Sequence, residues 1–285
     1  MGAALETVTA YVTNGTGTAG TYYAMAAQSG QSLTIRATPT DSAGYMAAVF
    51  AQGSVATNVQ IKSARMHDQV IGTTFPVPIY SAALQPNVLV GLDYTEPVWN
   101  VDTLTAQAAT LATAGFTALL GFTVAYPNLG GIKQNLATWA QVQTYVNPAN
   151  KTGLHYVSWV TPTIGGTIGV QGAGVAINSV NDQFKAGHTY ALLGYLCPTA
   201  VGAVQLVGTD TGNLYVGGPG SPDAKVTADY FVSLSLRLNL PTIPLVQANN
   251  KGNTFVTVTD THATSGTPEI GLIWLDLGTS VPIPD

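Results

Sequence analysis

The sequence has few charged residues. They make up 8% of its 285 residues, against an average of about 25% in soluble domains. Hydrophobic residues reach 46%, so enough apolar surface is present for a substantial core. Intrinsic disorder combines high charge with low hydrophobicity, and neither condition holds here. We therefore expect a folded protein whose surface is built mainly from Thr, Ser, Asn, Gln and Gly.

Basic residues are especially scarce. Nine Lys and Arg stand against fourteen Asp and Glu, which gives a formal net charge of -5. The basic residues are scattered singly, whereas nucleic-acid binders carry a dense basic patch that neutralises phosphates. Direct binding of a genome by this chain is therefore not expected.

Cysteine and long apolar runs are also nearly absent. Cys197 is the only cysteine, so no intramolecular disulfide can form. No run of about 18 apolar residues occurs, and the start, MGAALETVTAYVT, lacks the basic and apolar regions of a secretory signal. We expect neither a membrane-spanning helix nor a leader.

The sequence contains no recognisable catalytic motif. No G-x-S-x-G, Walker loop or C-x-x-C is present, and the only glutamates, Glu6, Glu96 and Glu269, stand in different segments. No metal-binding spacing such as H-x-x-x-H links the four histidines, His67, His155, His188 and His262. We expect a protein that is not an enzyme and that needs no cofactor.

One pair of acids could bind a metal ion. Asp93 and Glu96 stand close together in DYTEP, and carboxylate oxygens are the ligands that Ca²⁺ prefers. The pair suggests a weak calcium site at a loop or subunit interface, and a plain strand end is the alternative interpretation.

Strand patterns dominate the chain. Runs rich in β-branched residues recur between Gly, Pro, Asn and Asp, and the segment 226–239 alternates between apolar and polar residues as a sandwich strand does. Two helices are also predicted. The first covers 102–122, with Asp102 or Thr103 as its N-cap, and the second is a short helix within 136–146.

The two halves of the sequence contain similar segments. An offset of 166 (244 − 78) places Pro78 on Pro244 and Asn87 on Asn253, and an offset of 157 (187 − 30) places SGQSLTI (29–35) on AGHTYAL (186–192). Chance is the alternative, because both halves are rich in Thr, Val, Ala and Gly. A duplication predicts an all-β protein of two tandem eight-stranded antiparallel β-sandwiches, or jelly rolls, with one or two short helices. Their predicted bounds are 1–147, with the helical insertion near 102–122, and 148–285.

This organisation resembles the double jelly-roll major capsid proteins of tailless icosahedral viruses, bacteriophages among them. The segments that carry the resemblance are SGQSLTI with AGHTYAL, FPVPI with PTIPL, and the closing strand EIGLIWLDL. The resemblance implies a structural protein of the virion. Three copies would form a pseudo-hexagonal capsomer that contacts neighbouring capsomers and minor capsid or vertex proteins. Whether a membrane lies beneath the shell is left open.

A carbohydrate-binding or adhesive β-sandwich protein, such as a phage fibre, a spike or a surface lectin, is the second interpretation. Such proteins share the Thr-, Gly- and Asn-rich composition. This hypothesis predicts exposed aromatic residues in a groove and a small oligomer instead of a shell. A glycan-active enzyme with two paired acids ranks third.

Overall fold

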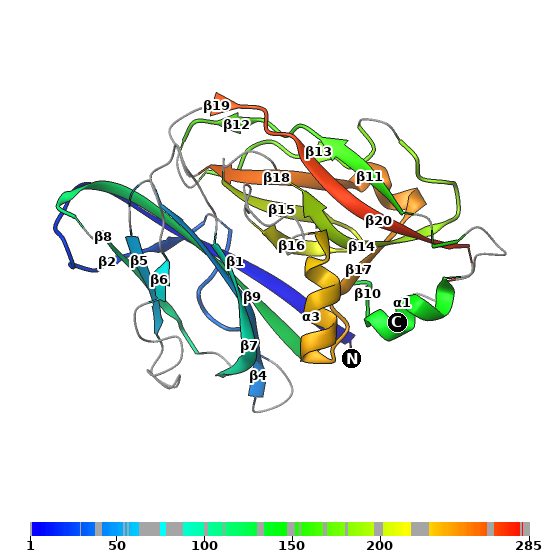
Figure 1. The fold of residues 1–285 in the computed structure, drawn as a ribbon, viewed down its shortest axis with the longest axis horizontal. Helices are drawn as coiled ribbons and strands as arrows, with labels where there is room; N and C mark the ends of the chain where they lie inside the picture. The colour runs from blue at the N-terminus through cyan, green and yellow to red at the C-terminus, as the bar shows by residue number, and fades with distance from the viewer. Residues whose placement is uncertain are drawn as a thin grey trace.

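The fold consists almost entirely of antiparallel β-sheets (Figure 1). The computed structural model describes residues 2–28, 30–37, 42–53, 55, 57–62, 75–77, 88–99, 102–110, 112–129, 134–146, 152–153, 155–167, 170–179, 182–196, 202–217, 228–260, 265–279 and 281. Within these residues, the strands form two five-stranded sheets, two four-stranded sheets and one two-stranded ribbon. The prediction of a mostly β protein with few helices is confirmed.

The first two sheets are formed by residues 2–129. Their strands are β1 (Gly2–Gly17), β2 (Tyr23–Ala24), β3 (Ala26–Ala27), β4 (Ser42–Gly53), β5 (Thr57–Lys62), β6 (Phe75–Val77), β7 (Val88–Trp99), β8 (Thr105–Thr110) and β9 (Ala114–Leu129). The strand orders are β3-β1-β9-β4-β7 and β2-β8-β5-β6.

The remaining sheets are formed by residues 136–278. Their elements are β10 (Leu136–Ala137), α1 (Trp139–Tyr145), β11 (His155–Val160), β12 (Ile164–Gly165), β13 (Val175–Ala176), β14 (Thr189–Leu196), β15 (Gly202–Gly208), β16 (Gly212–Gly217), α3 (Tyr230–Leu238), β17 (Ile243–Gln247), the 3₁₀ helix η2 (Ala248–Asn253), β18 (Thr254–Asp260), β19 (Ser265–Gly266) and β20 (Ile270–Gly278). The strand orders are β10-β17-β14-β20-β11 and β13-β18-β15-β16, and β12 pairs with β19.

The same strand connectivity occurs twice. In the first half we set aside β3 and number the other eight strands along the chain. The two sheets then have the orders 1-8-3-6 and 2-7-4-5. In the second half we set aside β10, β12 and β19 and number the other eight strands in the same way. The two sheets again have the orders 1-8-3-6 and 2-7-4-5, and the eight strands are β11, β13, β14, β15, β16, β17, β18 and β20. We call these the first and the second eight-stranded set.

The similar segments found in the sequence do not correspond to this repeat. Residues 75–94 contain the fifth and part of the sixth strand of the first set, whereas 240–260 contain the sixth and seventh strands of the second. Strands at the same position in the two sets are not separated by 157 or 166 residues. The sixth strands, for example, are β7 and β17, and β17 begins 155 residues after β7 (243 − 88). Similar composition, and not shared position, therefore produced the matches at offsets 157 and 166.

The predicted helix at 102–122 is wrong. Residues 105–110 form β8, which pairs with β5 from Thr57↔Thr110 to Lys62↔Thr105, and β9 pairs with both β1 and β4. Exposure alternates over 105–108, with Ala106 and Ala108 buried, and the last two residues of β8 are also buried. The frequent Thr residues disfavour a helix, since their branched side chains lose rotamers against the preceding turn, and ladder partners are available on both sides of β9.

The predicted strand at 226–239 is also wrong, because residues 230–238 form α3. The sequence alternates with period 2, but Phe231, Leu234 and Leu238 also lie on one helical face, and this face packs into the second core. Asn239 ends the helix in the left-handed conformation at φ 53°. Period-2 alternation was therefore ambiguous here.

The predicted helix within 136–146 is confirmed as α1. Thr138 Oγ1 accepts a hydrogen bond from Gln141 N at 3.1 Å, and the Gln141 side chain accepts one from Thr138 N at 2.8 Å, which makes a capping box. The helix precedes the predicted boundary at 147, yet the adjoining strand β10 pairs with β17 of the second half. The boundary stays a prediction.

Removing this cap should have a measurable effect. Thr138→Ala leaves the backbone N–H of Gln141 without its acceptor, so we expect a loss of about 1 kcal/mol in the free energy of unfolding. Chemical denaturation measures this loss. Gln143→Ala, at an exposed position of the same helix, is the control. An equal loss in both variants would argue against the capping role.

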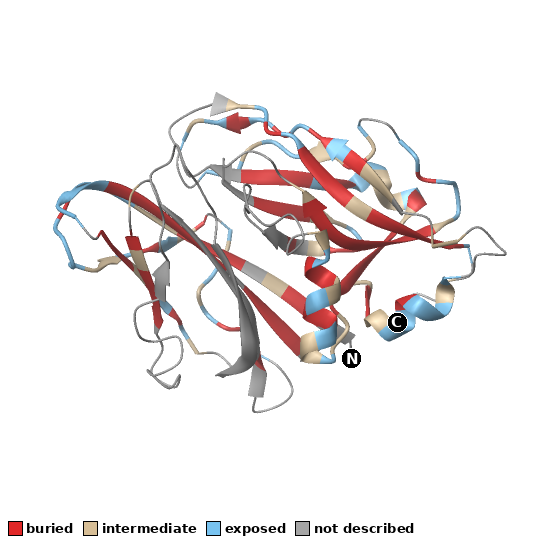
Figure 2. Ribbon diagram, in the orientation of Figure 1, coloured by how far each residue is buried: buried red, intermediate tan, exposed pale blue. Residues whose placement is uncertain are grey.

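Each eight-stranded set encloses its own hydrophobic core (Figure 2). β1 and β9 contribute to both cores, because their two faces are buried on different sides. Ala4 and Val124 belong to the first core, whereas Leu5 and Ala125 belong to the second. The outer face of the β1–β9 pair is thus covered by the second half of the chain.

Candidate functional site

The calcium prediction concerns Asp93 and Glu96, which both lie in β7. The register between β4 and β7 shifts here: Met46 pairs with Glu96, and Ala48 pairs with Gly91. The side chains of β7 lie outside the described part, so this site stays a prediction. Among the described residues, no three His, Cys, Asp or Glu side chains are grouped to hold a metal ion.

The other candidate residues are spread along the chain. His67, His262 and Cys197 lie outside the described residues, and His155 is the first residue of β11, with its side chain not described. His188 is different, because it lies just before β14 and contacts a buried carboxylate.

That carboxylate is Asp276 on β20, whose side chain is only 3% exposed. Its Oδ1 lies 2.8 Å from His188 Nδ1 and accepts a hydrogen bond from Gly278 N at 2.9 Å, and its Oδ2 accepts one from Lys185 Nζ at 3.0 Å. An ionised carboxylate only accepts, so His188 Nδ1 must carry the proton. This arrangement attaches the segment 182–188 to β20.

Burial by itself would raise the pKa of the Asp276 carboxyl. The hydrogen bonds from His188, Gly278 and Lys185 outweigh this effect and lower the pKa below its ordinary value of 3.8. The group therefore stays a carboxylate at neutral pH, and the chemical step available to it is uptake of one proton in acid.

Aromatic rings lie close to the segment 182–188. Phe184 makes edge-to-face contacts with Tyr156, Tyr190 and Trp274, at ring-centroid distances of 5.4, 4.6 and 5.4 Å. Burial raises the pKa of the Tyr156 hydroxyl far above its ordinary value. Sequence reasoning missed this cluster, although a single acid inside the apolar run IGLIWLDLG (270–278) was an available signal, because acids are rarely buried unless paired.

A second buried acid, Asp210, lies in the turn between β15 and β16. Its carboxylate accepts hydrogen bonds from Asn135 Nδ2 at 2.9 Å, from Gln247 N at 3.0 Å, and from Asn250 Nδ2 at 2.9 and 3.0 Å. Its backbone oxygen accepts one from Asn135 N at 2.8 Å. Asp210 thus joins three segments of the second half through amide donors.

The contact between the two eight-stranded sets combines apolar residues, such as Leu5 and Ala125 in the second core, with uncharged polar side chains. Gln205 Nε2 on β15 lies 3.4 Å from Thr9 Oγ1 on β1, and both residues are fully buried. Gln171 Nε2 donates to Gln205 Oε1 at 2.8 Å, and Gln134 bonds both N and O of Leu5 at 2.7 Å. Such groups cost less to bury than ions.

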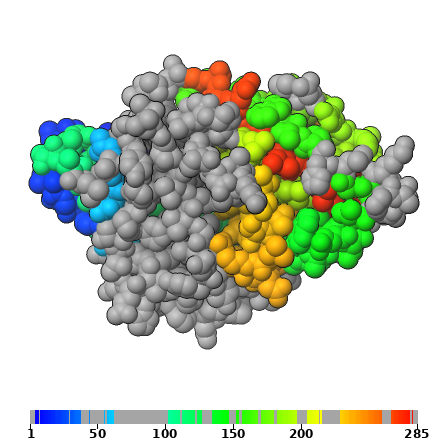
Figure 3. Space-filling view, viewed as in Figure 1, coloured from blue at the N-terminus to red at the C-terminus, as the bar shows by residue number. Residues whose placement is uncertain are grey.

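One aromatic side chain is exposed on the sheet formed by β10, β17, β14, β20 and β11. Trp159 on β11 is 36% exposed. Its ring and Val157 lie over Gly271 of β20, each with a carbon 3.0 Å from where a Cβ would stand. Trp274, in contrast, is fully buried in the second core. Figure 3 shows another part of the surface, where α3 and α1 lie next to each other.

Among the comparisons with known proteins, only the search of solved structures gives a likeness. No family model and no curated protein match this sequence. Among solved structures, the chain is similar to the crystal structure of the major capsid protein P2 from bacteriophage PM2, with a TM-score of 0.24 and 10% identity over 94% of this chain and 97% of that chain. Within the described residues, no helix is long and apolar enough to cross a membrane.

Proposed function

We propose that this chain is a viral structural protein, a major capsid subunit made of two tandem jelly rolls. The observation that carries the proposal is the strand order, 1-8-3-6 and 2-7-4-5, found once in each half. It is the order of an eight-stranded jelly roll, an architecture that viral capsid proteins use. In this proposal the chain resides in the virion and acts without catalysis or a cofactor.

The contact between the two sets within one chain suggests how copies of the chain would contact each other. The outer face of β1 and β9 is covered by the second set, through contacts such as Thr9–Gln205. β11 and β20 occupy the same positions in the second set as β1 and β9 in the first. Their outer face carries Trp159 and Val157, and in the proposal it packs against another copy of this chain.

Repeated head-to-tail contacts of this kind form closed rings when the rotation between copies closes. Three copies, each with two jelly rolls, would give a pseudo-hexagonal capsomer that joins neighbouring capsomers into an icosahedral shell. Minor capsid or vertex proteins are the other partners in this proposal, and direct contact with nucleic acid is not part of it.

Trp159→Asp tests the proposed contact. A charge placed in an apolar contact that excludes water should weaken assembly by about 2 kcal/mol or more per site, so the concentration needed for assembly should rise more than about tenfold. Light scattering measures that concentration. Leu236→Asp, at a 66% exposed position on α3, is the matched control. Unchanged assembly of Trp159→Asp would remove this face from the proposal.

Salt gives an independent test. Contacts made of uncharged groups are little affected by ionic screening, so assemblies should persist when moderate salt is added. Light scattering measures the size of the assemblies as salt is added. Dissociation at moderate salt would contradict the proposed chemistry of the contacts.

A carbohydrate-binding or adhesive protein is the second candidate. The exposed ring of Trp159 favours it, because sugars stack on exposed aromatic rings and lectin domains also use jelly rolls. It predicts a small oligomer whose glycan binding is lost in Trp159→Ala. Binding to a glycan array by the unassembled protein would favour this candidate over the shell.

A further inference from the structure

Ion pairs are concentrated at one end of the second eight-stranded set. Of the four ion pairs found among the described residues, three lie there: Lys185–Asp276, His188–Asp276 and Lys251–Asp182. The fourth, Arg36–Glu6, lies in the first half. Since only 8% of all residues are charged, this concentration indicates a specific role.

All three pairs involve the segment 182–188, which precedes β14. Asp276 holds its C-terminal part through Lys185 and His188, and Lys251 of η2 holds its N-terminal part through Asp182. The backbone adds one further contact, from Ala248 N to His188 O at 2.9 Å. Charged side chains from β20 and η2 thus fix this segment from two sides.

We propose that Asp276, Lys185 and His188 form an acid-sensitive latch, which holds the segment 182–188 against β20 at neutral pH and releases it in acid while the sheets stay folded. The latch goes beyond the proposed shell function and does not depend on it.

One proton suffices for release because Lys185 and His188 bind the same carboxylate. A protonated Asp276 is neutral, so it no longer attracts Lys185 or His188. The hydrogen bonds from Lys185 and His188 then lose their charged acceptor, and hydrogen bonds to a charged group are about twice as strong as neutral ones. The other acid of the cluster, Asp182, is bound to Lys251.

The direction of the pH effect follows from the lowered pKa of Asp276. A carboxyl whose pKa is lower in the folded chain stabilises the fold above its unfolded pKa, and this contribution is lost as the pH falls through the folded pKa. Release is therefore expected below about pH 4. The nearby hydroxyls of Tyr156 and Tyr190 have raised pKa values, so they stay neutral throughout this range.

Hydrogen exchange can follow the latch, because three amides in the segment are hydrogen-bonded. Phe184 N donates to Asp182 Oδ1 at 3.1 Å, Lys185 N to Tyr190 Oη at 2.8 Å, and His188 N to Lys185 O at 3.1 Å. Strand β14, residues 189–196, follows directly and is buried along most of its length. It serves as the internal reference at every pH.

The experiment measures exchange of the full chain by mass spectrometry at neutral pH and at about pH 2, well below the ordinary pKa of the carboxyl. The exchange rate of 182–188, divided by that of 189–196, should rise at least about tenfold in acid. Asp276→Asn should show the released ratio already at neutral pH and change little in acid. Glu6→Gln, which removes the Arg36–Glu6 pair, is the control and should behave like the unmodified chain.

Two results would overturn the latch. One is a ratio that stays constant between the two pH values in the unmodified chain. The other is simultaneous exchange of 182–188 and 189–196 in acid, which would mean global unfolding. If Asp276→Asn fails to fold, Lys185→Gln, which alters the half-exposed partner, should raise the ratio at neutral pH, and an unchanged ratio would again contradict the proposal.

Discussion

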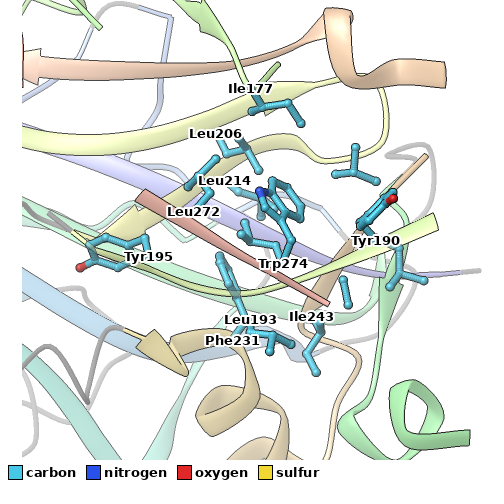
Figure 4. Packing of buried hydrophobic residues seen from close by; sticks show 14 of the residues in the cluster. Ile177, Tyr190, Leu193, Tyr195, Leu206, Leu214, Phe231, Ile243, Leu272 and Trp274 are labelled. Atoms are coloured by element: carbon cyan, nitrogen blue, oxygen red, sulfur yellow. The ribbon is translucent and has the colours of Figure 1, made fainter. Parts of the chain in front are cut away.

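Replacement of Trp274 with alanine is expected to destabilise the protein by about 3–5 kcal/mol. Trp274 lies on β20 at the centre of the second core, with no exposed surface (Figure 4). Its ring contacts Phe184, and its Nε1 donates to Ser158 Oγ at 2.7 Å. Alanine would leave a cavity and also a buried hydroxyl without its donor, and both effects reduce stability.

Urea denaturation measures this loss as a lower midpoint at an unchanged slope. Trp159→Ala is the matched control, because it removes the same side chain from the neighbouring strand β11 at a partly exposed position. The control should lose less than about 1 kcal/mol when the protein is unassembled. Similar losses in the two variants would show that the core is not centred on Trp274.

Asp210→Ala is the second substitution with a large expected effect, about 3–5 kcal/mol, summed over the hydrogen bonds that it removes. The carboxylate accepts hydrogen bonds from Asn135, Gln247 and Asn250. Alanine would leave these half-buried donors without their charged acceptor, and each hydrogen bond to a charged group contributes about 1.5–3 kcal/mol. The turn between β15 and β16 should then separate from η2 and from the residues before β10.

Thermal unfolding of Asp210→Ala should show a much lower midpoint than that of Asp229→Ala. Asp229 is the exposed N-cap of α3, and its side chain makes no capping hydrogen bond, so its replacement should change stability by less than about 0.5 kcal/mol. If both variants unfold at the same temperature, Asp210 does not join these segments as described.

Strands were the most predictable part of the fold. The apolar runs 189–196 and 243–247 lie between turn residues, a pattern that predicts strands, and they form β14 and β17. The strand predicted at 226–239 was wrong because the apolar residues of 230–238 fit both the strand period and the helix period. Only packing of Phe231 and Leu234 against the second core decides for the helix.

The repeat was expected for a reason that the structure does not support. Both halves share a strand order, yet the segments that looked alike in sequence occupy different positions in that order. Connectivity depends on which strands pair across long loops, and the many Thr-, Val- and Gly-rich runs are too alike to specify these pairs. The strand order could therefore be found only from the structure.

The charged cluster was unpredictable for a similar reason. Asp276 lies 88 residues from His188 and 91 from Lys185 along the chain, so no local spacing links them. Pairing of β14 with β20, where Tyr190 lies opposite Asp276, brings these segments together. A single acid in an apolar strand indicates a buried partner but does not identify it.

Electron microscopy of the purified full chain, with light scattering on the same sample, tests the central proposal most directly. The account predicts closed icosahedral particles, or stable trimers with six roll-like densities around a ring. A monodisperse monomer that forms no larger species at high concentration would contradict it.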